Sequence, residues 1–248
     1  MNKFTIASVA VATALLAGCG GSSNSNDDKD LDLPEVPTGG EAEVCFNADL
    51  WTDGTHVITE KNGDEETIIV KTGASFQGMP NLVSVTEDFG DGEFYSLYFA
   101  VNNKSVFNAG SEWAENNGDF EKRVHKPVKP FQLFGLNEAE SSSESGDSDR
   151  EWDWTNDCEP GEQCIGSETE AYDITITFNG FEEVIIDGIA YETCRFEIDD
   201  SEEDGDIQHS WIDRQSGVEI QSAWNDGQPS SYIAKYEIDG VQIFPAAE

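Results

Sequence analysis

The sequence predicts an all-β protein made of antiparallel meander sheets, in the form of a curved sheet, a sandwich or a half-barrel. Three observations predict this class. Turn dipeptides recur along the chain, the runs between them are rich in Val, Ile, Thr, Tyr and Phe, and apolar and polar residues alternate within those runs. Beyond the first eighteen residues, no segment shows the sustained apolar stripe of an amphipathic helix.

Turns are expected at short runs of Asn, Asp, Ser and Gly, because Asn, Asp and Gly tolerate the positive φ angles of short hairpin turns. Such positions recur about every eight to twelve residues, a spacing typical of short antiparallel strands. They are Asn62-Gly63, Gly90-Asp91-Gly92, Asn102-Asn103, Asn116-Asn117-Gly118, Asn179-Gly180, Asp187-Gly188, Asp204-Gly205, Ser216-Gly217, Asp226-Gly227 and Asp239-Gly240.

Alternation is clearest in the second half of the chain. Within 190–198, Cys194, Phe196 and Ile198 fall on one face of an extended strand, with charged and polar residues on the other. The same pattern recurs in 206–213, 218–224 and 232–238. Each strand therefore has one apolar face, which a second sheet, a barrel or a short helix must cover.

The chain divides into a first β half at 42–136 and a second β half at 154–248. Between them, 137–153 reads NEAESSSESGDSDREWD and contains almost no apolar residue. Such a segment cannot contribute a face to a core, so we expect a disordered acidic insertion. Whether the halves form one continuous sheet or two lobes is left open, although a disulfide between them would favour one domain.

The N-terminus has the parts of a secretion signal. Lys3 is followed by an apolar run that is too short to span a bilayer, and the run ends in Leu16-Ala17-Gly18-Cys19. This sequence resembles the lipobox of bacterial lipoproteins. The resemblance implies a signal peptide at 1–18, lipidation of Cys19 and a flexible tether at 19–41. Lipoproteins of this kind go to the outer membrane unless Asp follows the cysteine, and here Gly20 follows.

Composition excludes some partners. Lys and Arg total 13 against 51 Asp and Glu, which gives a formal net charge of −38. This charge repels phosphate backbones and argues against nucleic-acid binding. It also repels anionic lipid headgroups, so we expect acyl chains on Cys19 to provide the contact with the membrane.

The cysteine count agrees with export. Apart from Cys19, the chain has Cys45, Cys158, Cys164 and Cys194, and four cysteines in an oxidising compartment allow three pairings. Cys158 and Cys164 flank a Pro-Gly loop that can bring its ends together. We therefore favour Cys158–Cys164 with Cys45–Cys194, without excluding the other two pairings.

The second half also resembles uncharacterised secreted bacterial lipoproteins. The shared pattern is TFNGFEEVIIDGIAYETCRFEI, then HSWIDRQSGVEIQSAW, then YIAKYEIDGV, in which Asp187-Gly188, Tyr191, Trp211 and Gly217-Val218 take the corresponding places. The resemblance implies a curved antiparallel sheet of unknown activity.

Catalytic patterns are weak. There is no G-x-S-x-G and no H-E-x-x-H, and the three histidines (His56, His125 and His209) are far apart in sequence. We expect neither catalysis nor a cofactor. The alternative is a periplasmic hydrolase of a polysaccharide or peptide that uses paired carboxylates. Trp113, Trp152 and Trp154 are the tryptophans that could stack on sugars.

One acidic loop partly resembles a calcium loop. Asp200, Glu202 and Asp204 take the first, third and fifth positions of an EF-hand pattern, with Gly205 at the sixth. The twelfth position is Trp211 instead of Glu, and the flanks are expected to be strands. We therefore assign no metal site and keep these three acids as a weak calcium candidate, with the same caution for the acidic turn at 87–93.

The leading functional hypothesis is a non-enzymatic binding or structural module at the outer membrane. A curved sheet could hold a hydrophobic ligand or part of an envelope protein on its apolar face. The residues predicted to line that face are Phe196, Ile198, Trp211, Val218, Ile220 and Tyr236. The competing interpretation is that these side chains only fill the core.

Overall fold

The computed structural model describes residues 31, 33–102, 104–158, 161, 163–203, 206–225 and 228–245. Within them the chain forms three short 3-10 helices, η1 (Glu41–Cys45), η2 (Asp49–Trp51) and η3 (Ser201–Glu203). The strands are β1 (Gly54–Glu60), β2 (Glu65–Phe76), β3 (Met79–Gly90), β4 (Glu93–Asn102), β5 (Ser105–Ala114), β6 (Phe120–Leu133), β7 (Glu140–Asp153), β8 (Ile165–Ile186), β9 (Ile189–Asp200), β10 (Ile207–Asp213), β11 (Glu219–Trp224), β12 (Gln228–Ile238) and β13 (Val241–Phe244). The predicted all-β antiparallel class is confirmed.

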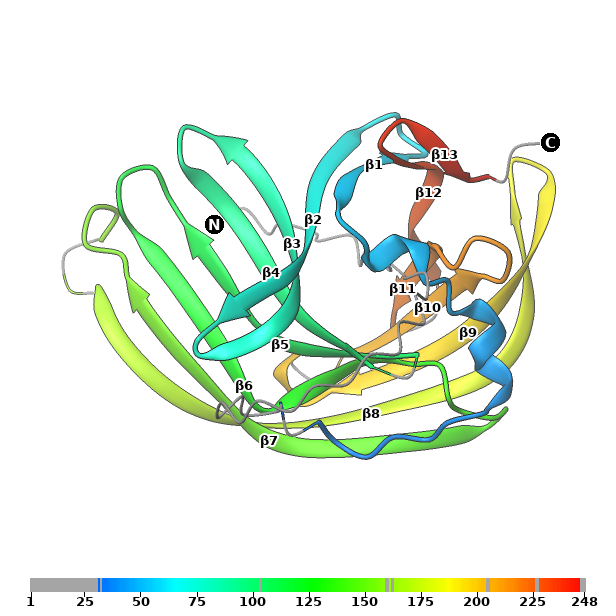
Figure 1. The fold of residues 1–248 in the computed structure, drawn as a ribbon, viewed down its shortest axis with the longest axis horizontal. Helices are drawn as coiled ribbons and strands as arrows, with labels where there is room; N and C mark the ends of the chain where they lie inside the picture. Colours follow the sequence, from blue (N-terminus) through cyan, green and yellow to red (C-terminus); the bar gives the residue numbers. More distant parts are fainter. Residues whose placement is uncertain are drawn as a thin grey trace, which may run out of the picture.

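The strands close into a barrel. Each strand pairs with the next one, and β1 also pairs antiparallel with β12, so that twelve strands form one ring (Figure 1). In the closing ladder, His56 lies opposite Ile238 and Ile58 lies opposite Tyr236. β13 pairs with the end of β12 as a further short strand. A closed barrel is more specific than the predicted curved sheet, sandwich or half-barrel, because local sequence does not show which distant strands pair.

Several predicted turns join adjacent strands as two-residue hairpin turns. Both turn residues have positive φ at Asp187-Gly188 (52° and 85°) and at Asp239-Gly240 (48° and 78°). Asp91-Gly92, between β3 and β4, has the same pattern at 54° and 92°. These angles fit type I′ turns, whose twist matches that of the flanking strands.

The predicted turn at Asn179-Gly180 is wrong. Both residues lie inside β8, where the register with β9 shifts between Phe178 and Phe181. Gly180 has φ 90°, so its positive φ produces a β-bulge and the strand continues. The Asn-Gly dipeptide, which favours a turn, here forms a kink within a 22-residue strand.

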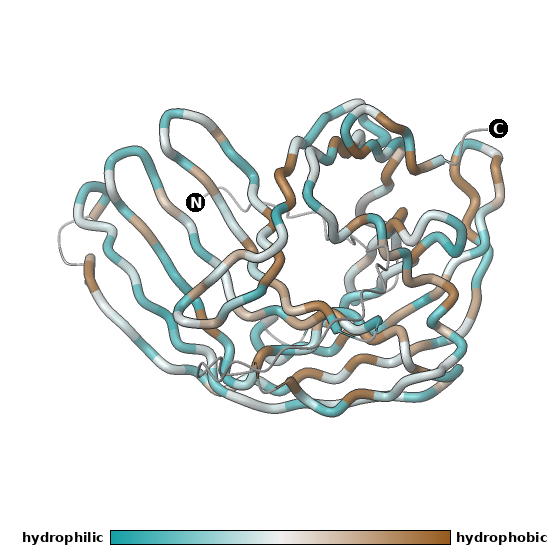
Figure 2. Tube along the Cα trace, in the orientation of Figure 1, coloured by the Kyte–Doolittle hydropathy of each residue, from teal (hydrophilic) through white to brown (hydrophobic). Residues whose placement is uncertain are grey.

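Two clusters of buried apolar side chains form the core. Figure 2 shows hydrophobic and hydrophilic residues alternating along the strands, as expected for walls with one buried face. The first cluster includes Val70 and Val85, which lie opposite each other, and Phe99 on the next strand. The second includes Phe178 and Phe196, which are opposite each other on β8 and β9.

The segment before β1 packs against these clusters. Leu50 and Trp51 of η2 are buried in the first cluster, and Cys45 of η1 is buried in the second. Leu33 and Val36 also pack on the second cluster. The predicted tether at 19–41 is therefore too long, because its last residues already contact the core.

The predicted disordered insertion at 137–153 is wrong. Most of it is β7, which pairs with β8 along its whole length. Polar pairs across the ladder stabilise it, including hydrogen bonds of 2.8 Å between Ser141 and Thr177 and between Ser143 and Thr175. β7 needs no apolar face of its own, because β8 supplies Tyr172, Ile174, Ile176 and Phe178 to the core.

β6, β7 and β8 join 42–136 to 154–248 within the same ring. In the described part of the chain, no helix is both long enough and apolar enough to cross a bilayer.

Both favoured disulfides are present. Cys45–Cys194 links η1 to β9 across 149 residues of sequence, and Cys158–Cys164 closes a loop of six. In the chain-entropy account, a cross-link stabilises more when the loop that it closes is longer: about 3 kcal/mol for a 15-residue loop and about 4.7 kcal/mol for a 100-residue loop.

We therefore predict that the double variant Cys45→Ser/Cys194→Ser has a lower melting temperature than Cys158→Ser/Cys164→Ser. Differential scanning calorimetry of the purified mature proteins measures both, with non-reducing peptide mapping to verify the remaining bridge. An equal or smaller loss in the Cys45→Ser/Cys194→Ser variant would contradict this ranking.

Candidate functional site

Of the six residues predicted to line a ligand face, five are buried and Ile198 is partly buried. Trp211, Val218, Ile220 and Tyr236 belong to the first core cluster, and none is more than 3% exposed. Phe196 belongs to the second cluster, and Ile198 packs against it. Their burial agrees with a core role, while a role as ligand contacts stays a prediction.

Phe196 and Ile198 also line a small cavity. Its volume is about 10 Å³, close to the smallest space that holds one water molecule. The other lining residues are Phe131, Gln132, Ile176, Gln208, Ser210, Ile212 and Glu219. As the barrel stands, this cavity has room for a water but not for a hydrophobic ligand.

Glu219 places a carboxyl group in this apolar surrounding. Its side chain is 5% exposed, and the Ser210 hydroxyl donates a hydrogen bond of 2.6 Å to Oε2. Burial raises the pKa of Glu219 to about 8, and the Ser210 hydrogen bond opposes this only in part. Glu219 is therefore mostly protonated at neutral pH.

A second cluster of largely buried polar side chains includes Asp200 and Glu202, two of the three acids that form the weak calcium candidate. Lys129 forms ion pairs with Asp200 at 2.5 Å and with Glu202, and Arg123 lies 3.1 Å from Glu202. Burial acts to raise the pKa of Glu202, but the hydrogen bond and charge of Lys129 hold it below its usual value. Asp204 lies outside the described residues, so calcium binding by the three acids stays a prediction.

Two of the histidines, His56 and His125, are buried in the core. His56 Nδ1 lies 2.8 Å from the Tyr236 hydroxyl, and both side chains are fully buried. Burial lowers the pKa of His56 to about 4, and burial together with Lys129 lowers that of His125 to about 4. Both rings are therefore neutral near pH 7, which suits core packing.

Strand register gathers aromatic side chains along one rim of the barrel. Tyr95 lies opposite Trp113, Trp113 opposite Glu121, and Glu121 opposite Trp152. Directly opposed residues of an antiparallel ladder share a face, so these four side chains form one line across β4 to β7. Trp154 adds a further ring, 6.5 Å from that of Trp113. We call Tyr95, Trp113, Trp152 and Trp154 the aromatic row. All four are partly exposed.

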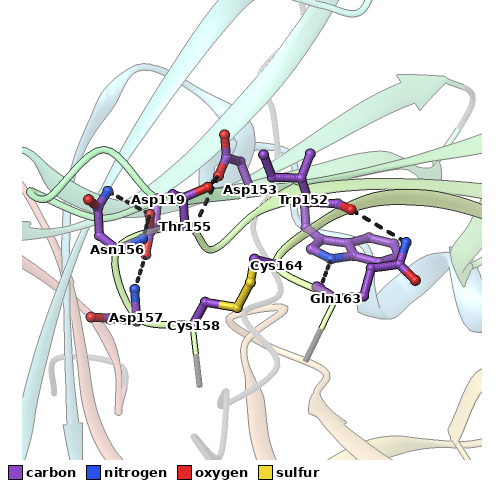
Figure 3. Close-up of a disulfide and its surroundings, with 10 residues drawn as sticks. Asp119, Trp152, Asp153, Thr155, Asn156, Asp157, Cys158, Gln163 and Cys164 are labelled. Atoms are coloured by element: carbon purple, nitrogen blue, oxygen red, sulfur yellow. Dashed lines mark hydrogen bonds between the residues drawn. A yellow bond between two sulfur atoms is a disulfide. The ribbon is translucent and has the colours of Figure 1, made fainter. Parts of the chain in front are cut away.

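Arg150 fixes one end of the aromatic row. Its guanidinium lies over the Trp152 ring at 5.2 Å and donates hydrogen bonds of 2.8 and 2.7 Å to the two carboxylate oxygens of Glu121. A bidentate pair of this kind holds both planar groups in a defined orientation. Trp152 is also held by its indole N–H, which donates to the carbonyl of Gln163 at 3.2 Å (Figure 3).

The loop after β7 is anchored to the β5–β6 turn by Asp119. This carboxylate is 1% exposed and accepts hydrogen bonds from the backbone N–H groups of Asn156 and Asp157, each at 3.0 Å (Figure 3). The backbone N–H of Trp154 donates to the backbone carbonyl of Cys164 at 2.7 Å, beside the Cys158–Cys164 bridge. The loop therefore holds Trp154 next to Trp113.

Three carboxylates meet beside the aromatic row. One ligand atom from each of Glu115, Asp119 and Asp157 lies within 4.8 Å of the others. Burial raises the pKa of Glu115, and the neighbouring Asp157 raises it further. Sequence reasoning missed this acidic cluster, because its members come from two loops far apart in the chain and only the turn at Asn116-Asn117-Gly118 was predicted.

The predicted acidic turn at 87–93 borders a groove. The groove has a volume of about 430 Å³ and lies over β2, β3 and β4. Its lining is mostly polar, with Lys71, Thr86 and Asp88 among its residues.

Comparison with protein-family models found no match for this chain, and searches among curated proteins and solved structures found none either.

Glu219 gives a prediction for stability against pH. Because the folded protein holds a carboxyl group whose pKa is raised to about 8 from 4.5, ionisation favours the unfolded state. The stabilisation is complete below pH 4.5 and is lost as pH rises through 8. Glu219→Gln keeps the acceptor for Ser210 and removes the titration.

We expect the variant and the wild type to have similar melting temperatures near pH 5, and the variant to be more stable near pH 9 by up to about 4 kcal/mol. Thermal unfolding followed by circular dichroism at both pH values measures this. The pKa of Glu66 is also raised, to about 7. Because Glu66 is present in both proteins, the difference in stability between wild type and variant at each pH reports on Glu219. Parallel pH profiles of the two proteins would contradict a protonated Glu219.

Proposed function

We propose that the chain is a lipid-anchored extracytoplasmic lipoprotein that serves as a binding module at the outer membrane. The observation that carries the proposal is the contrast between the barrel interior and its rim. The interior is packed with apolar side chains, while one rim carries partly exposed aromatic rings. A rigid, cross-linked wall with a fixed aromatic surface is suited to recognition, because little ordering is needed on binding.

Anchoring is proposed from the N-terminal sequence. The lipobox at Leu16-Ala17-Gly18-Cys19 supports a signal peptide at 1–18 and lipidation of Cys19, and Gly20 supports sorting to the outer membrane. These residues lie outside the described part of the chain. Burial of acyl methylenes contributes about 0.8 kcal/mol each, so two or three chains hold a protein on the membrane despite a charge of −38.

The partner is proposed to be another component of the envelope. A hydrophobic ligand inside the barrel is less well supported, because the cavity at Phe196 and Ile198 measures about 10 Å³. A ligand of that kind would have to displace the core packing around Glu219. The aromatic row needs no such opening.

The anchor gives a direct prediction. Cys19→Ala removes the thiol that accepts the diacylglyceryl group, so the variant should carry no lipid and leave the membrane fraction. Cell fractionation and intact mass measurement of the recovered protein test this. Cys158→Ser is the matched control, since it also removes a cysteine and should stay in the membrane fraction. Membrane retention of Cys19→Ala with its lipid intact would contradict the anchor.

One observation favours a hydrolase as the second candidate function. Carboxylate oxygens of Glu115 and Asp157 lie within 4.8 Å of each other, and glycosidases act through two carboxyl groups held close together. The raised pKa of Glu115 is what a general acid needs. Tryptophans lie close to both acids in sequence, since Trp113 is two residues before Glu115 and Trp154 is three residues before Asp157.

If the chain is a hydrolase, the wild type should hydrolyse a soluble neutral polysaccharide, and the Glu115→Gln substitution should abolish this turnover. Reducing-end release measures it, with Glu170→Gln on exposed β8 surface as the control for general charge effects. Absence of turnover by the wild type, or equal turnover by Glu115→Gln, would reject this alternative.

A further inference from the structure

We propose that the aromatic row, with the carboxylates beside it, is a platform that binds an uncharged, extended oligosaccharide. This inference rests on the proposed binding function and names the ligand class of the same rim. It depends on three features of the described residues: the alignment of the rings, the polar groups between them and the sign of the surrounding charge.

The first feature is alignment. Tyr95, Trp113, Glu121 and Trp152 lie opposite one another in successive ladders, so their side chains stand on one face of four adjacent strands. Neighbouring strands are about 4.8 Å apart, which places Tyr95 and Trp152 about 14 Å apart across the sheet. A line of this length fits several linked sugar rings better than one monosaccharide.

The second feature is the mixture of ring faces and oxygen acceptors. Sugar rings carry C–H groups on their faces and hydroxyls at their edges. Aromatic faces pack against the C–H groups, while carboxylates accept hydrogen bonds from the hydroxyls. Glu121 lies between Trp113 and Trp152 in the row, and Glu87 lies opposite Tyr95 at its other end. The row thus alternates the two kinds of contact that a sugar chain needs.

The third feature is charge. The chain carries a formal net charge of −38, and Glu93, Glu115 and Asp157 lie at the same rim. Arg150 is already paired with Glu121 and Glu168. Acidic polysaccharides would be repelled from this surface, as nucleic acids would be, whereas an uncharged glycan would not.

The rings are held in place by the fold. Arg150 and the carbonyl of Gln163 position Trp152. Asp119 anchors the loop that carries Trp154 by accepting hydrogen bonds from Asn156 and Asp157 (Figure 3). The rings of Tyr95 and Trp113 pack edge to face, with their centroids 6.3 Å apart. Little side-chain freedom is therefore lost when a ligand binds, which favours measurable affinity from a small contact surface.

The test uses the purified mature lipoprotein in a detergent without sugar headgroups. Isothermal titration calorimetry is carried out with cellohexaose, mannohexaose and chitohexaose, and with hexagalacturonate as an acidic probe. We expect saturable binding of at least one uncharged hexasaccharide and none of hexagalacturonate. Trp154→Ala and Tyr95→Ala should each weaken the binding by about tenfold or more. Trp224→Ala, on β11, is the matched control and should leave the affinity unchanged.

A measurement on the wild type keeps the test independent of folding in the variants. The six tryptophans give six indole N–H signals in a nitrogen-edited NMR spectrum. On addition of the bound hexasaccharide, the signals of Trp113, Trp152 and Trp154 should shift, while those of Trp51 and Trp211 in the core should not. Shifts confined to Trp224, or no binding of any uncharged hexasaccharide, would overturn the proposal.

A photo-crosslinking residue at position 154 in intact cells separates this proposal from the proposed function. Capture of a glycan supports both. Capture of a protein, with no hexasaccharide bound in vitro, overturns the saccharide platform but keeps a binding module. Absence of any capture and of any hexasaccharide binding overturns both.

Discussion

The pairing of β1 with β12 is the constraint on which the rest of the structure depends. It brings together residues such as His56 and Tyr236, which are 180 positions apart, and turns a meander into a ring. Barrels of about eight strands enclose a space that inward side chains just fill. A ring of twelve encloses more, and the described part of the segment before β1 supplies additional side chains. Leu50 and Trp51 join the first core cluster, and the Cys45–Cys194 bridge fastens the same segment to β9. The described residues just before β1 are thus part of the core of the closed barrel.

Charge imposes a second constraint, because acids outnumber bases by 51 to 13. Buried carboxylates need a partner or a proton, since an unpaired charge in an apolar surrounding is costly. Buried acids are accommodated in several ways: Glu202 is paired with Lys129, Asp119 and Asp213 accept backbone N–H groups, and Glu219 keeps its proton. Some of the basic residues, namely Lys129, Arg123 and Arg150, compensate acids at buried or half-buried positions. Exposed ion pairs such as Lys61–Asp187 contribute at most about 1 kcal/mol.

Local patterns predicted what depends on local chemistry. Asp187-Gly188 and Asp239-Gly240 form the expected turns, because two positive φ angles favour these residues wherever they occur. The disulfide pairing that the short Cys158–Cys164 loop favoured is present, although the sequence left two other pairings open. Features that depend on partner strands were missed. The polar strand β7 is stable because β8 pairs with all of it, and Gly180 is a bulge because β9 continues past it. Neither fact is visible in the segment itself. For the same reason, local patterns allowed a barrel as one way to cover the apolar faces but did not select it.

The candidate site was only partly accessible from sequence, and the reason is register. Trp113, Trp152 and Trp154 were recognised as tryptophans that could contact sugars, but Tyr95 and Glu121 carry no local sign of belonging with them. They join the same line only because the β4–β5, β5–β6 and β6–β7 ladders are each in the observed register. A slip of one residue in any of these ladders would turn its side chains to the opposite face. The turns and bulges that fix the barrel therefore also fix the aromatic row. The rim depends on the whole ring although it lies outside the core.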